Sequence, residues 1–418
     1  MEENVKNLYD TDEEVERVVL VGVELDPKDD VESSLDELSE LAKTAGAVTV
    51  ARMIQSRDSY HPATYVGTGK TEELRNVIAE TNATGIICDD ELSPAQLRNL
   101  EDILGTKIMD RTMLILDIFA SRASSSEGKI QVEMAQLKYR STILSGLGTT
   151  LSRLGGGIGT RGPGEKKIET DRRLIRDRIS KLSKELEEVK RHRDVARQLR
   201  EKNSSFSAAI VGYTNAGKST LLNYLTGAGV LSEDKLFATL DPTTRSLTLP
   251  NGEKVLLTDT VGFIRKLPHN LIDAFKSTLE EAKYADVLIH VADLSNEDLD
   301  RHMDTVYKTL EQLGIKDKPV ITLFNKCDKF EELPTVKDLK AKYTINISAK
   351  TGENIDKLLL CIQDIIQESR VRIERCFAYS EAGKIQLIRE YGQLESEEYT
   401  ENGIEVKAYV PRQISDRL

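Results

Sequence analysis

The 418-residue sequence predicts an α/β protein built from four consecutive parts. Short apolar runs alternate with helical patterns in two separate regions, which is typical of sheets with helices on their faces. A glycine-rich stretch between two long helical patterns separates these regions. We therefore expect an N-terminal parallel α/β domain, an antiparallel helical hairpin, a doubly wound P-loop domain and a small α+β C-terminal appendage. The expected boundaries are 1–120, 121–203, 204–369 and 370–418.

The first region contains three apolar runs that predict strands, at residues 18–25, 47–54 and 85–90. Amphipathic helical patterns follow these runs, and two of them stop at Gly46 and Gly105. Glycine just past the last periodic residue is a common end for a helix. Strands separated by helices predict a small parallel sheet.

Residues 127–145 predict one helix, and a much longer helical pattern follows residue 164. The longer pattern has a seam with a seven-residue repeat, formed by Ile168, Ile175, Leu182, Val189 and Ala196, with Ile179 and Leu186 between them. Such a repeat is typical of coiled-coil packing. Two helices joined by a short loop therefore predict an antiparallel hairpin.

The loop expected at 146–164 contains 8 glycines in 19 residues and carries Arg153 and Arg161. Residues 151–202 hold 16 lysines and arginines against 9 aspartates and glutamates, although the whole chain has a formal net charge of −12. Composition leaves two interpretations open. The loop is either a flexible linker, or a tip where glycine allows close approach to nucleic acid and arginine neutralises phosphate.

The strand patterns that resume after residue 204 are longer and more apolar, as in the centre of a doubly wound sheet. They lie at 207–212, 254–260, 285–293, 318–325 and 344–348. The appendage offers a strand at 371–379, a helix around 383–392 and a hairpin turn at 401–403.

Two stretches carry Gly-Lys followed by a hydroxyl residue, and one of them fits a phosphate loop. In "GYTNAGKS", Gly212 follows a buried-strand pattern, four residues intervene, and Gly217 precedes Lys218 and Ser219 at a helix start. This is the P-loop pattern. Lys218 would reach the β- and γ-phosphates and stabilise the transition state, and the Ser219 hydroxyl would bind Mg²⁺.

The other stretch, "YVGTGKTEEL" at 65–74, has Thr64 where the first glycine is required. We interpret it as the start of a helix that carries Leu74, Val77 and Ile78, not as a second nucleotide site. The Lys70 ammonium is then an ordinary surface charge.

A later strand ends in Asn325-Lys326-Cys327-Asp328. The Asp328 carboxylate can accept from the N1–H and the 2-amino group of guanine, which adenine does not offer. Asn325 would tie this loop to the phosphate loop. Ser348-Ala349-Lys350 ends the next strand, where the Ala349 N–H can donate to guanine O6. A base that leaves the Asp328 carboxylate unpaired, such as adenine, should therefore bind much more weakly than guanine.

Two further segments complete the predicted nucleotide site. Asp259 would hold Mg²⁺ through water, and the Gly262 N–H would sense the γ-phosphate. The first switch occupies 236–247, where we choose Thr239 among three threonines as a second Mg²⁺ ligand beside Ser219. The expected GTP-binding residues are Gly212, Tyr213, Thr214, Asn215, Ala216, Gly217, Lys218, Ser219, Phe237, Ala238, Thr239, Leu240, Asp241, Asp259, Thr260, Val261, Gly262, Asn325, Lys326, Cys327, Asp328, Ser348, Ala349 and Lys350. In this order and on strand ends, the motifs predict a GTPase.

No catalytic side chain beyond Lys218 is predicted. Ras-like enzymes place a glutamine after the switch glycine to orient water, whereas Phe263 follows Gly262 here. We expect slow hydrolysis without a partner, and the phenyl ring can also simply pack. Asn215 stands where GTPases activated by K⁺ often carry asparagine, so K⁺ is a second candidate cation.

Several classes of protein are disfavoured. No apolar run approaches the roughly 20 residues that span a bilayer, and the acidic N-terminus lacks the apolar core of a secretory signal. The cysteines have no metal-ligand spacing. They are Cys88, Cys327, Cys361 and Cys376. We expect a cytoplasmic monomer with reduced thiols.

The sequence resembles the HflX family of translational GTPases over nearly its whole length. The resemblance rests on "YVGTGKTEEL", "DDELSPAQLRNLED", "DRTMLILDIFASRASSSEGKIQVEMAQLKY", "LSRLGGGIGTRGPGEKKIETDRR", "FATLDPTTR", "DTVGFI" and "NKCD". It implies binding to the large ribosomal subunit, with the glycine-rich tip reaching ribosomal RNA near the peptidyl-transferase centre. It also implies dissociation or rescue of ribosomes, notably under stress.

Where many members carry Thr-Gln, this chain has Lys166 and Lys167, which would add positive charge on the RNA side beside Arg153 and Arg161. Two other classes stay open. One is a GTPase partner of an RNA-modifying enzyme, although the N-terminal half shows no catalytic cysteine motif or cofactor loop. The other is a signalling switch that uses the hairpin as a coiled-coil contact for a protein.

Overall fold

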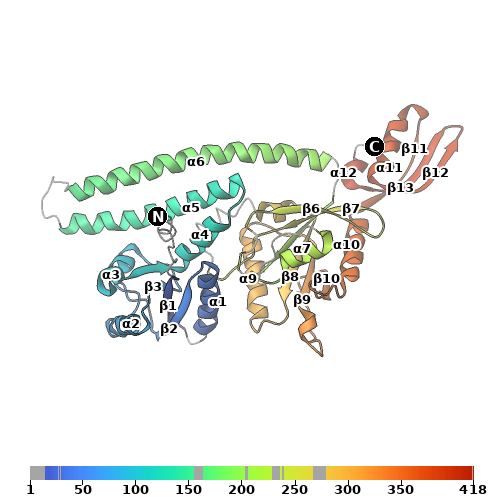
Figure 1. Ribbon diagram of the computed structural model, residues 1–418. Coiled ribbons are helices and arrows are strands. Elements are labelled where there is room, and N and C mark those ends of the chain that lie inside the picture. Colours follow the sequence, from blue (N-terminus) through green and yellow to red (C-terminus); the bar gives the residue numbers. More distant parts are fainter. Residues whose placement is uncertain are drawn as a thin grey trace, which may run out of the picture. The chain divides into compact units, whose positions relative to one another are not determined.

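The protein is described here from a computed structural model (Figure 1). The structure describes residues 15–26, 28, 30–154, 163–202, 206–227, 236–237, 240–266, 279–416 and 418. The chain divides into two compact units. The first contains 1–123, 131–182 and 266–272, and the second contains 124–130, 183–265 and 273–418. No helix of the described ranges is long and apolar enough to cross a membrane.

The first unit is built on a four-stranded parallel sheet with the order β2-β1-β3-β4. Its strands are β1 (Arg17–Glu24), β2 (Val48–Ser56), β3 (Gly85–Cys88) and β4 (Lys107–Asp110). Its helices are α1 (Val31–Thr44), α2 (Thr68–Thr81), α3 (Pro94–Leu104) and α4 (Arg111–Arg122). The predicted parallel α/β architecture is confirmed. β4 was not predicted, because its sequence Lys-Ile-Met-Asp has a charged residue at each end and no apolar run as long as that of the equally short β3.

Local sequence signals account for the helix ends in this unit. The Asp30 side chain accepts from the Ser33 N–H at 3.0 Å and begins α1. Ser93 and Gln96 form a reciprocal capping box at the start of α3, and Gly105 ends it with a φ of 65°. These are the N-cap and C-cap residues that such positions favour. α2 starts at Thr68, so the interpretation of the Lys70 stretch as a helix start is confirmed.

A buried ion pair lies between the sheet of this unit and α4. The Arg111 guanidinium, 1% exposed, donates to Asp89 at 2.8 Å and also to Glu37. Asp89 is equally buried and accepts a further bond from the Ser34 hydroxyl at 2.7 Å. Removing one partner of a buried pair strands the other charge in a medium that solvates it poorly.

We therefore expect Arg111→Met to lower the free energy of unfolding of this unit by about 3 kcal/mol. Arg98→Met is the matched control, because Arg98 forms an ion pair with Asp102 at 3.6 Å in which both side chains are exposed to solvent. Loss of such a pair should change stability by less than about 0.5 kcal/mol. Equilibrium urea denaturation of the full chain measures both. Equal stability of the two variants would contradict the assigned role of the buried pair.

The hairpin consists of α5 (Ser126–Leu154) and α6 (Pro163–Lys202). In the first unit, the Arg178 side chain pairs with Glu133 at 2.7 Å. In the second unit, the Arg193 side chain pairs with Glu127 at 2.9 Å. In the first unit, the Arg172 side chain also donates to the Leu144 carbonyl at 2.8 Å. Rising numbers on α6 therefore meet falling numbers on α5, and the two helices are antiparallel there, as predicted (Figure 1). Two residues of the predicted seam are buried, namely Ile175 and Leu182.

The predicted loop at 146–164 is wrong in its first part, because α5 continues to Leu154. Glycine in a helix costs only about 1 kcal/mol relative to alanine, so Gly146 and Gly148 do not by themselves end a helix. Arg161 lies outside the described residues. The side chains of Arg153, Lys166 and Lys167 are likewise outside them.

The second unit contains a six-stranded sheet with the order β10-β9-β8-β5-β7-β6. Its strands are β5 (Phe206–Gly212), β6 (Thr243–Thr248), β7 (Lys254–Asp259), β8 (Val287–Asp293), β9 (Val320–Asn325) and β10 (Tyr343–Asn346). All neighbours are parallel except the pair of β6 and β7. α7 (Lys218–Thr226), α9 (Leu299–Gln312) and α10 (Ile355–Ser369) connect strands. The predicted doubly wound sheet is confirmed, and the polar edge strand β6 was missed.

The C-terminal part of this unit is a three-stranded antiparallel sheet with the order β11-β13-β12. It contains β11 (Arg370–Phe377), α11 (Ala382–Tyr391), β12 (Gln393–Thr400), β13 (Gly403–Pro411) and α12 (Arg412–Ser415). The predicted strand, helix and hairpin of the α+β appendage are confirmed. All four cysteines of the chain are free thiols.

Candidate functional site

The phosphate-loop motif lies between β5 and α7, as the sequence predicts. β5 ends at Gly212, and Gly217 caps α7 with a φ of 97°. A side chain at Gly217 would also overlap the Asn325 amide. Glycine is therefore required at this position for two reasons: it adopts the left-handed backbone conformation, and it has no side chain to clash with Asn325. The N–H groups at the start of α7 have no intrahelical partners and suit an anion.

Oxygen ligands for a divalent cation are in place beside this loop. The Ser219 hydroxyl donates to Asp259 Oδ2 at 2.7 Å. Asp259 is fully buried at the end of β7. A hydroxyl and a carboxylate match the oxygen ligands that Mg²⁺ prefers. The two predicted residues are thus brought together, and they fit Mg²⁺ held directly by Ser219 and through water by Asp259.

Lys218 is the buried cation of the site. The residue is 6% exposed, and its ammonium donates to the Tyr213 carbonyl at 2.7 Å. Burial lowers the pKa of Lys218 to about 8, against a smaller opposing effect of the Asp259 charge. A nucleotide would supply anionic oxygens, which favour the charged ammonium and raise this pKa again.

Nucleotide binding should therefore take up protons above pH 8, where the empty site is partly neutral. We expect uptake of a large fraction of a proton when GDP binds at pH 8.5, and an affinity that falls as pH rises beyond 8. Calorimetry of GDP binding in two buffers with different ionisation enthalpies measures the uptake. No proton uptake at pH 8.5 would contradict the depressed pKa of Lys218.

The second switch motif lies against the phosphate loop. The Thr214 N–H donates to the Phe263 carbonyl at 2.8 Å, and the Phe263 N–H donates to the Gly212 carbonyl at 3.1 Å. A Cβ on Gly262 would lie 2.8 Å from Thr214 Cα and 2.9 Å from Lys218 Nζ. This approach requires glycine. The Phe263 side chain is 2% exposed, so it packs in the interior, which was the second of the two interpretations for this residue.

Asn325 joins the base motif to the phosphate loop. Its Nδ2 donates to the Ala216 carbonyl at 2.8 Å, which is the contact that the sequence predicts. Its Oδ1 accepts from the Ala349 N–H at 2.8 Å. This bond places the Ala349 N–H beside the base motif. Its donation to guanine O6 stays a prediction. Asp328 is exposed and lies within the short 3₁₀ turn Cys327–Lys329.

The first switch is described only in part. Ala238 and Thr239 lie outside the described residues, so the prediction for the Thr239 hydroxyl has no structural counterpart. Phe237 and Leu240 are buried. Asp241 does not behave as a nucleotide ligand, because its carboxylate accepts bonds from Ser124 and Ser125. A carboxylate would also repel phosphates, so the prediction for Asp241 is not supported.

The other predicted residues differ in exposure. Those that are buried are Tyr213, Thr214, Ala216, Thr260, Val261, Cys327 and Ser348. Asn215 and Lys350 are exposed, and Asn215 has a φ of 58°. The Lys326 side chain forms an ion pair with Asp293 at 2.7 Å. The position of this lysine along the plane of a bound guanine stays a prediction.

Sequence reasoning missed the surroundings of Tyr213. Its ring stacks on His302 of α9, with the ring centroids 3.7 Å apart and the planes 8° from parallel. Its hydroxyl accepts from the Arg265 N–H at 2.8 Å. Tyr213 thus contacts both α9 and the segment after Phe263. No local signal in a single sequence indicates either contact, because both partners are remote along the chain.

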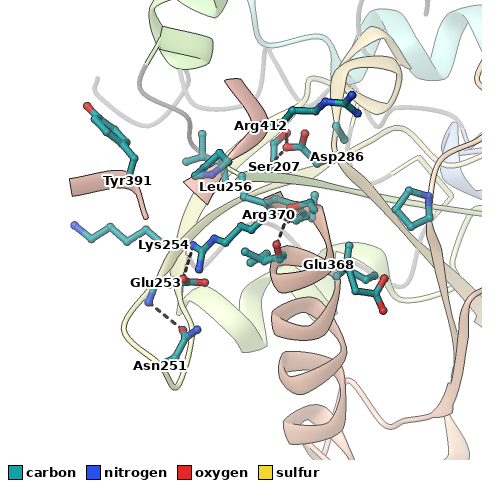
Figure 2. A pocket seen from close by; sticks show the side chains of 18 of the residues that line it. Ser207, Asn251, Glu253, Lys254, Leu256, Asp286, Glu368, Arg370, Tyr391 and Arg412 are labelled. Carbon is teal, nitrogen blue, oxygen red and sulfur yellow. Dashed lines mark hydrogen bonds and ion pairs between the residues drawn. The ribbon is translucent and has the colours of Figure 1, made fainter. Parts of the chain in front are cut away.

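The cavity in Figure 2 is not the nucleotide site. It measures about 1410 Å³ and is lined by Ser207, Glu253, Asp286, Arg370 and further described residues. The Arg370 guanidinium donates to Glu253 at 2.5 Å. This cavity lies at the amino ends of the parallel strands, whereas the motifs above follow their carboxyl ends. Ligands of doubly wound sheets bind at the carboxyl ends, so cavity size alone would misplace the site.

Three family models match the chain in succession. A GTP-binding GTPase N-terminal model matches residues 32–120, and a GTP-binding GTPase middle-region model matches 122–200. A model described as a 50S ribosome-binding GTPase matches 207–326.

Similar proteins are known from other organisms. GTPase HflX of Lacrimispora saccharolytica is 64% identical over 399 residues, which is 96% of this chain and 94% of that protein. GTPase HflX of Caldanaerobacter subterraneus is 52% identical over 404 residues, which is 96% of this chain and 93% of that protein. A crystal structure of an SsGBP–GDP complex is 28% identical, with a TM-score of 0.46, and covers 84% of this chain and 98% of that chain.

Proposed function

Because the chain belongs to the HflX family of GTPases, we propose that it is a GTP-switched factor of the large ribosomal subunit. It binds GTP and hydrolyses it to GDP and phosphate. In this proposal the GTP-bound form docks on the large subunit and dissociates or rescues ribosomes, notably under stress. The observation that carries the proposal is the match of residues 207–326 to a 50S ribosome-binding GTPase model.

The residues of the second unit have separable roles in hydrolysis. The N–H groups at the start of α7 and the Lys218 ammonium hold the phosphates and offset the charge that develops in the transition state. Ser219 and Asp259 would hold Mg²⁺, which neutralises charge on the β- and γ-phosphates when bound. The Gly262 N–H would contact the γ-phosphate. Asp328 selects guanine.

Slow hydrolysis by the free protein follows from the second switch. Phe263 is buried and has no group that could orient water. A missing water-positioning group is commonly supplied by a partner, with rate gains of about 10³- to 10⁵-fold. In our proposal the large subunit is that partner, so GTP is consumed mainly where the factor acts.

We assign delivery to the hairpin. α5 and α6 are 29 and 40 residues long, and residues 155–162 between them carry the glycine-rich sequence. Arg153, Arg161, Lys166 and Lys167 would neutralise RNA phosphates while glycine backbone approaches closely. The factor would act in the cytoplasm as a monomer.

Co-sedimentation with purified ribosomal subunits tests the proposal. The full chain with a non-hydrolysable GTP analogue should pellet with large subunits and not with small ones, and GDP should abolish the binding. A variant without residues 155–162 should bind more weakly, with less dependence on salt, because fewer phosphate contacts remain. Its intrinsic GTPase rate is the control and should be unchanged. Nucleotide-independent binding, or binding to neither subunit, would contradict the proposal.

We further propose that K⁺ assists hydrolysis at Asn215. This residue is exposed in the phosphate loop, and its carbonyl could help to hold a monovalent cation beside the β- and γ-phosphates, where positive charge stabilises the transition state. Hydrolysis should be faster in K⁺ than in Na⁺ at matched ionic strength, and Asn215→Ala should remove the difference. Equal rates of the unmodified protein in the two salts would count against a K⁺ site.

A further inference from the structure

Asp241 makes an unusually dense set of hydrogen bonds just before β6. Its Oδ2 accepts from the Ser124 N–H at 2.9 Å, the Ser124 hydroxyl at 2.7 Å and the Ser125 N–H at 2.7 Å. Its Oδ1 accepts from the Ser125 hydroxyl. All three residues belong to the second compact unit. One carboxylate thus binds four donors of a segment that is more than a hundred residues away in sequence.

The bonded segment is the beginning of α5. The Ser125 carbonyl accepts from the Lys129 N–H at 3.0 Å, and the Ser125 hydroxyl accepts from the Gly128 N–H at 2.9 Å. Ser125 therefore caps the helix by itself, and Asp241 adds an outer anion at the same end. Free N–H groups and the helix dipole favour a negative charge there.

The carboxylate keeps its charge at neutral pH. Burial raises the pKa of Asp241, but the bonds from Ser125 and Ser124 outweigh that effect and lower the pKa overall. Bonds to an ionised acceptor are about twice as strong as neutral ones. The contact is therefore a charged one under the conditions in which the GTPase works.

Gly128 provides the space for this contact. A Cβ on Gly128 would overlap Asp241 Oδ1, and it would also lie 3.1 Å from the Ser125 hydroxyl. The glycine has an ordinary helical backbone, so the requirement comes from proximity alone. Ser124, Ser125 and Gly128 together form a cradle for the Asp241 carboxylate.

The two sides of the contact have different roles. Asp241 follows the predicted first switch segment, whose Leu240 is already buried. The cradle begins α5, the first helix of the hairpin. We infer that Asp241 is a positioning residue that clamps the end of the first switch to the start of α5, so that the nucleotide state and the helix are energetically linked.

Asp241→Asn tests the clamp in the full-length protein. The amide keeps the shape but loses the charge and one acceptor oxygen. We expect the single-turnover rate of GTP hydrolysis to fall about tenfold, because loss of charged hydrogen bonds is worth at least that factor. GDP affinity should stay within about twofold, because GDP does not engage the first switch. The GDP measurement also shows that the variant is folded.

Hydrogen exchange distinguishes a clamp that responds to the nucleotide from a residue that only caps the helix. In the unmodified protein, amides of residues 124–130 should exchange at different rates with GDP and with a non-hydrolysable GTP analogue. In Asp241→Asn the two rates should be the same. A residue that only stabilises α5 would raise exchange equally in both nucleotide states and leave the difference intact.

Gly128→Ala disrupts the same contact from the helix side, because the added Cβ would overlap Asp241 Oδ1, while every polar group is kept. It should reproduce the loss of rate, and it should add little to Asp241→Asn in the double variant, because both changes remove one interaction. Gly383→Ala is the matched control, because Gly383 lies in α11 and a Cβ there meets nothing within 4 Å.

Two results would overturn the inference. One is unchanged GTP hydrolysis in Asp241→Asn and Gly128→Ala. The other is a nucleotide-dependent difference in exchange at 124–130 that persists in Asp241→Asn.

Discussion

We expect Lys218→Ala to weaken GTP and GDP binding by at least about 100-fold, because the buried ammonium would bond to two phosphate groups and each charged bond is worth about 1.5–3 kcal/mol. The ammonium lies within the phosphate loop, 2.7 Å from the Tyr213 carbonyl. Binding of a fluorescent GDP analogue to the full chain measures the loss.

Lys70→Ala is the matched control, because it removes a lysine from the other Gly-Lys stretch. The Lys70 side chain pairs with Glu73 at 2.7 Å on the surface of α2, and the first turn of that helix is closed by the Thr71 hydroxyl, which donates to the Gly67 carbonyl at 3.0 Å. Nucleotide binding should be unchanged. The interpretation of a single site fails if the Lys218→Ala protein still binds a nucleotide that is lost only when Lys70→Ala is added.

The second large effect concerns the base. Asp328→Asn should weaken GTP binding by about 10⁴-fold, because a site built for a hydrogen-bonding partner discriminates by that factor when the partner is mismatched. Xanthosine triphosphate should bind better than GTP, because an amide can donate to the O2 of xanthine. Competition against labelled GDP measures both affinities.

Asp304→Asn is the control for removal of one negative charge from this unit. Asp304 is exposed on α9, where it pairs with Lys308 at 2.6 Å, and its loss should not alter the preference for guanine. Unchanged GTP affinity in Asp328→Asn would remove Asp328 from the base site.

Much of the fold could be predicted because its signals are local. Long apolar runs such as β8 and capped helices such as α3 can be recognised from fewer than about a dozen consecutive residues. β4 and β6 could not be found in this way, since β4 reads Lys-Ile-Met-Asp and β6 reads Thr-Thr-Arg-Ser-Leu-Thr. Each becomes a strand by pairing with a neighbour already in the sheet, which is a tertiary effect.

The same distinction holds at the site. Lys218, Ser219 and Asp259 could be predicted because each follows a strand within a recognisable spacing. The partners of Asp241 and Ala349 could not be predicted. Asp241 meets Ser124 across a separation of 117 residues, and the Ala349 N–H donates to a side chain from the neighbouring strand. Such contacts depend on the packed structure, and a single sequence carries no record of them.

Glycine content alone does not predict where the hairpin loop begins. Gly146 and Gly148 favour a loop over 146–154, yet α5 includes these residues. Glycine lowers helix stability by only about 1 kcal/mol relative to alanine, so single glycines do not end a long helix. The glycine-rich part that remains between the helices is therefore shorter than composition suggests, at 155–162.

The central claim, a GTPase switched by the large ribosomal subunit, is tested most directly by the rate of GTP hydrolysis at increasing concentrations of purified subunits. We expect slow hydrolysis by the protein alone and a saturable rise of at least about 100-fold with large subunits, with no rise for small subunits and none for Lys218→Ala. Equal stimulation by both subunits, or a rate that neither subunit changes, would contradict it.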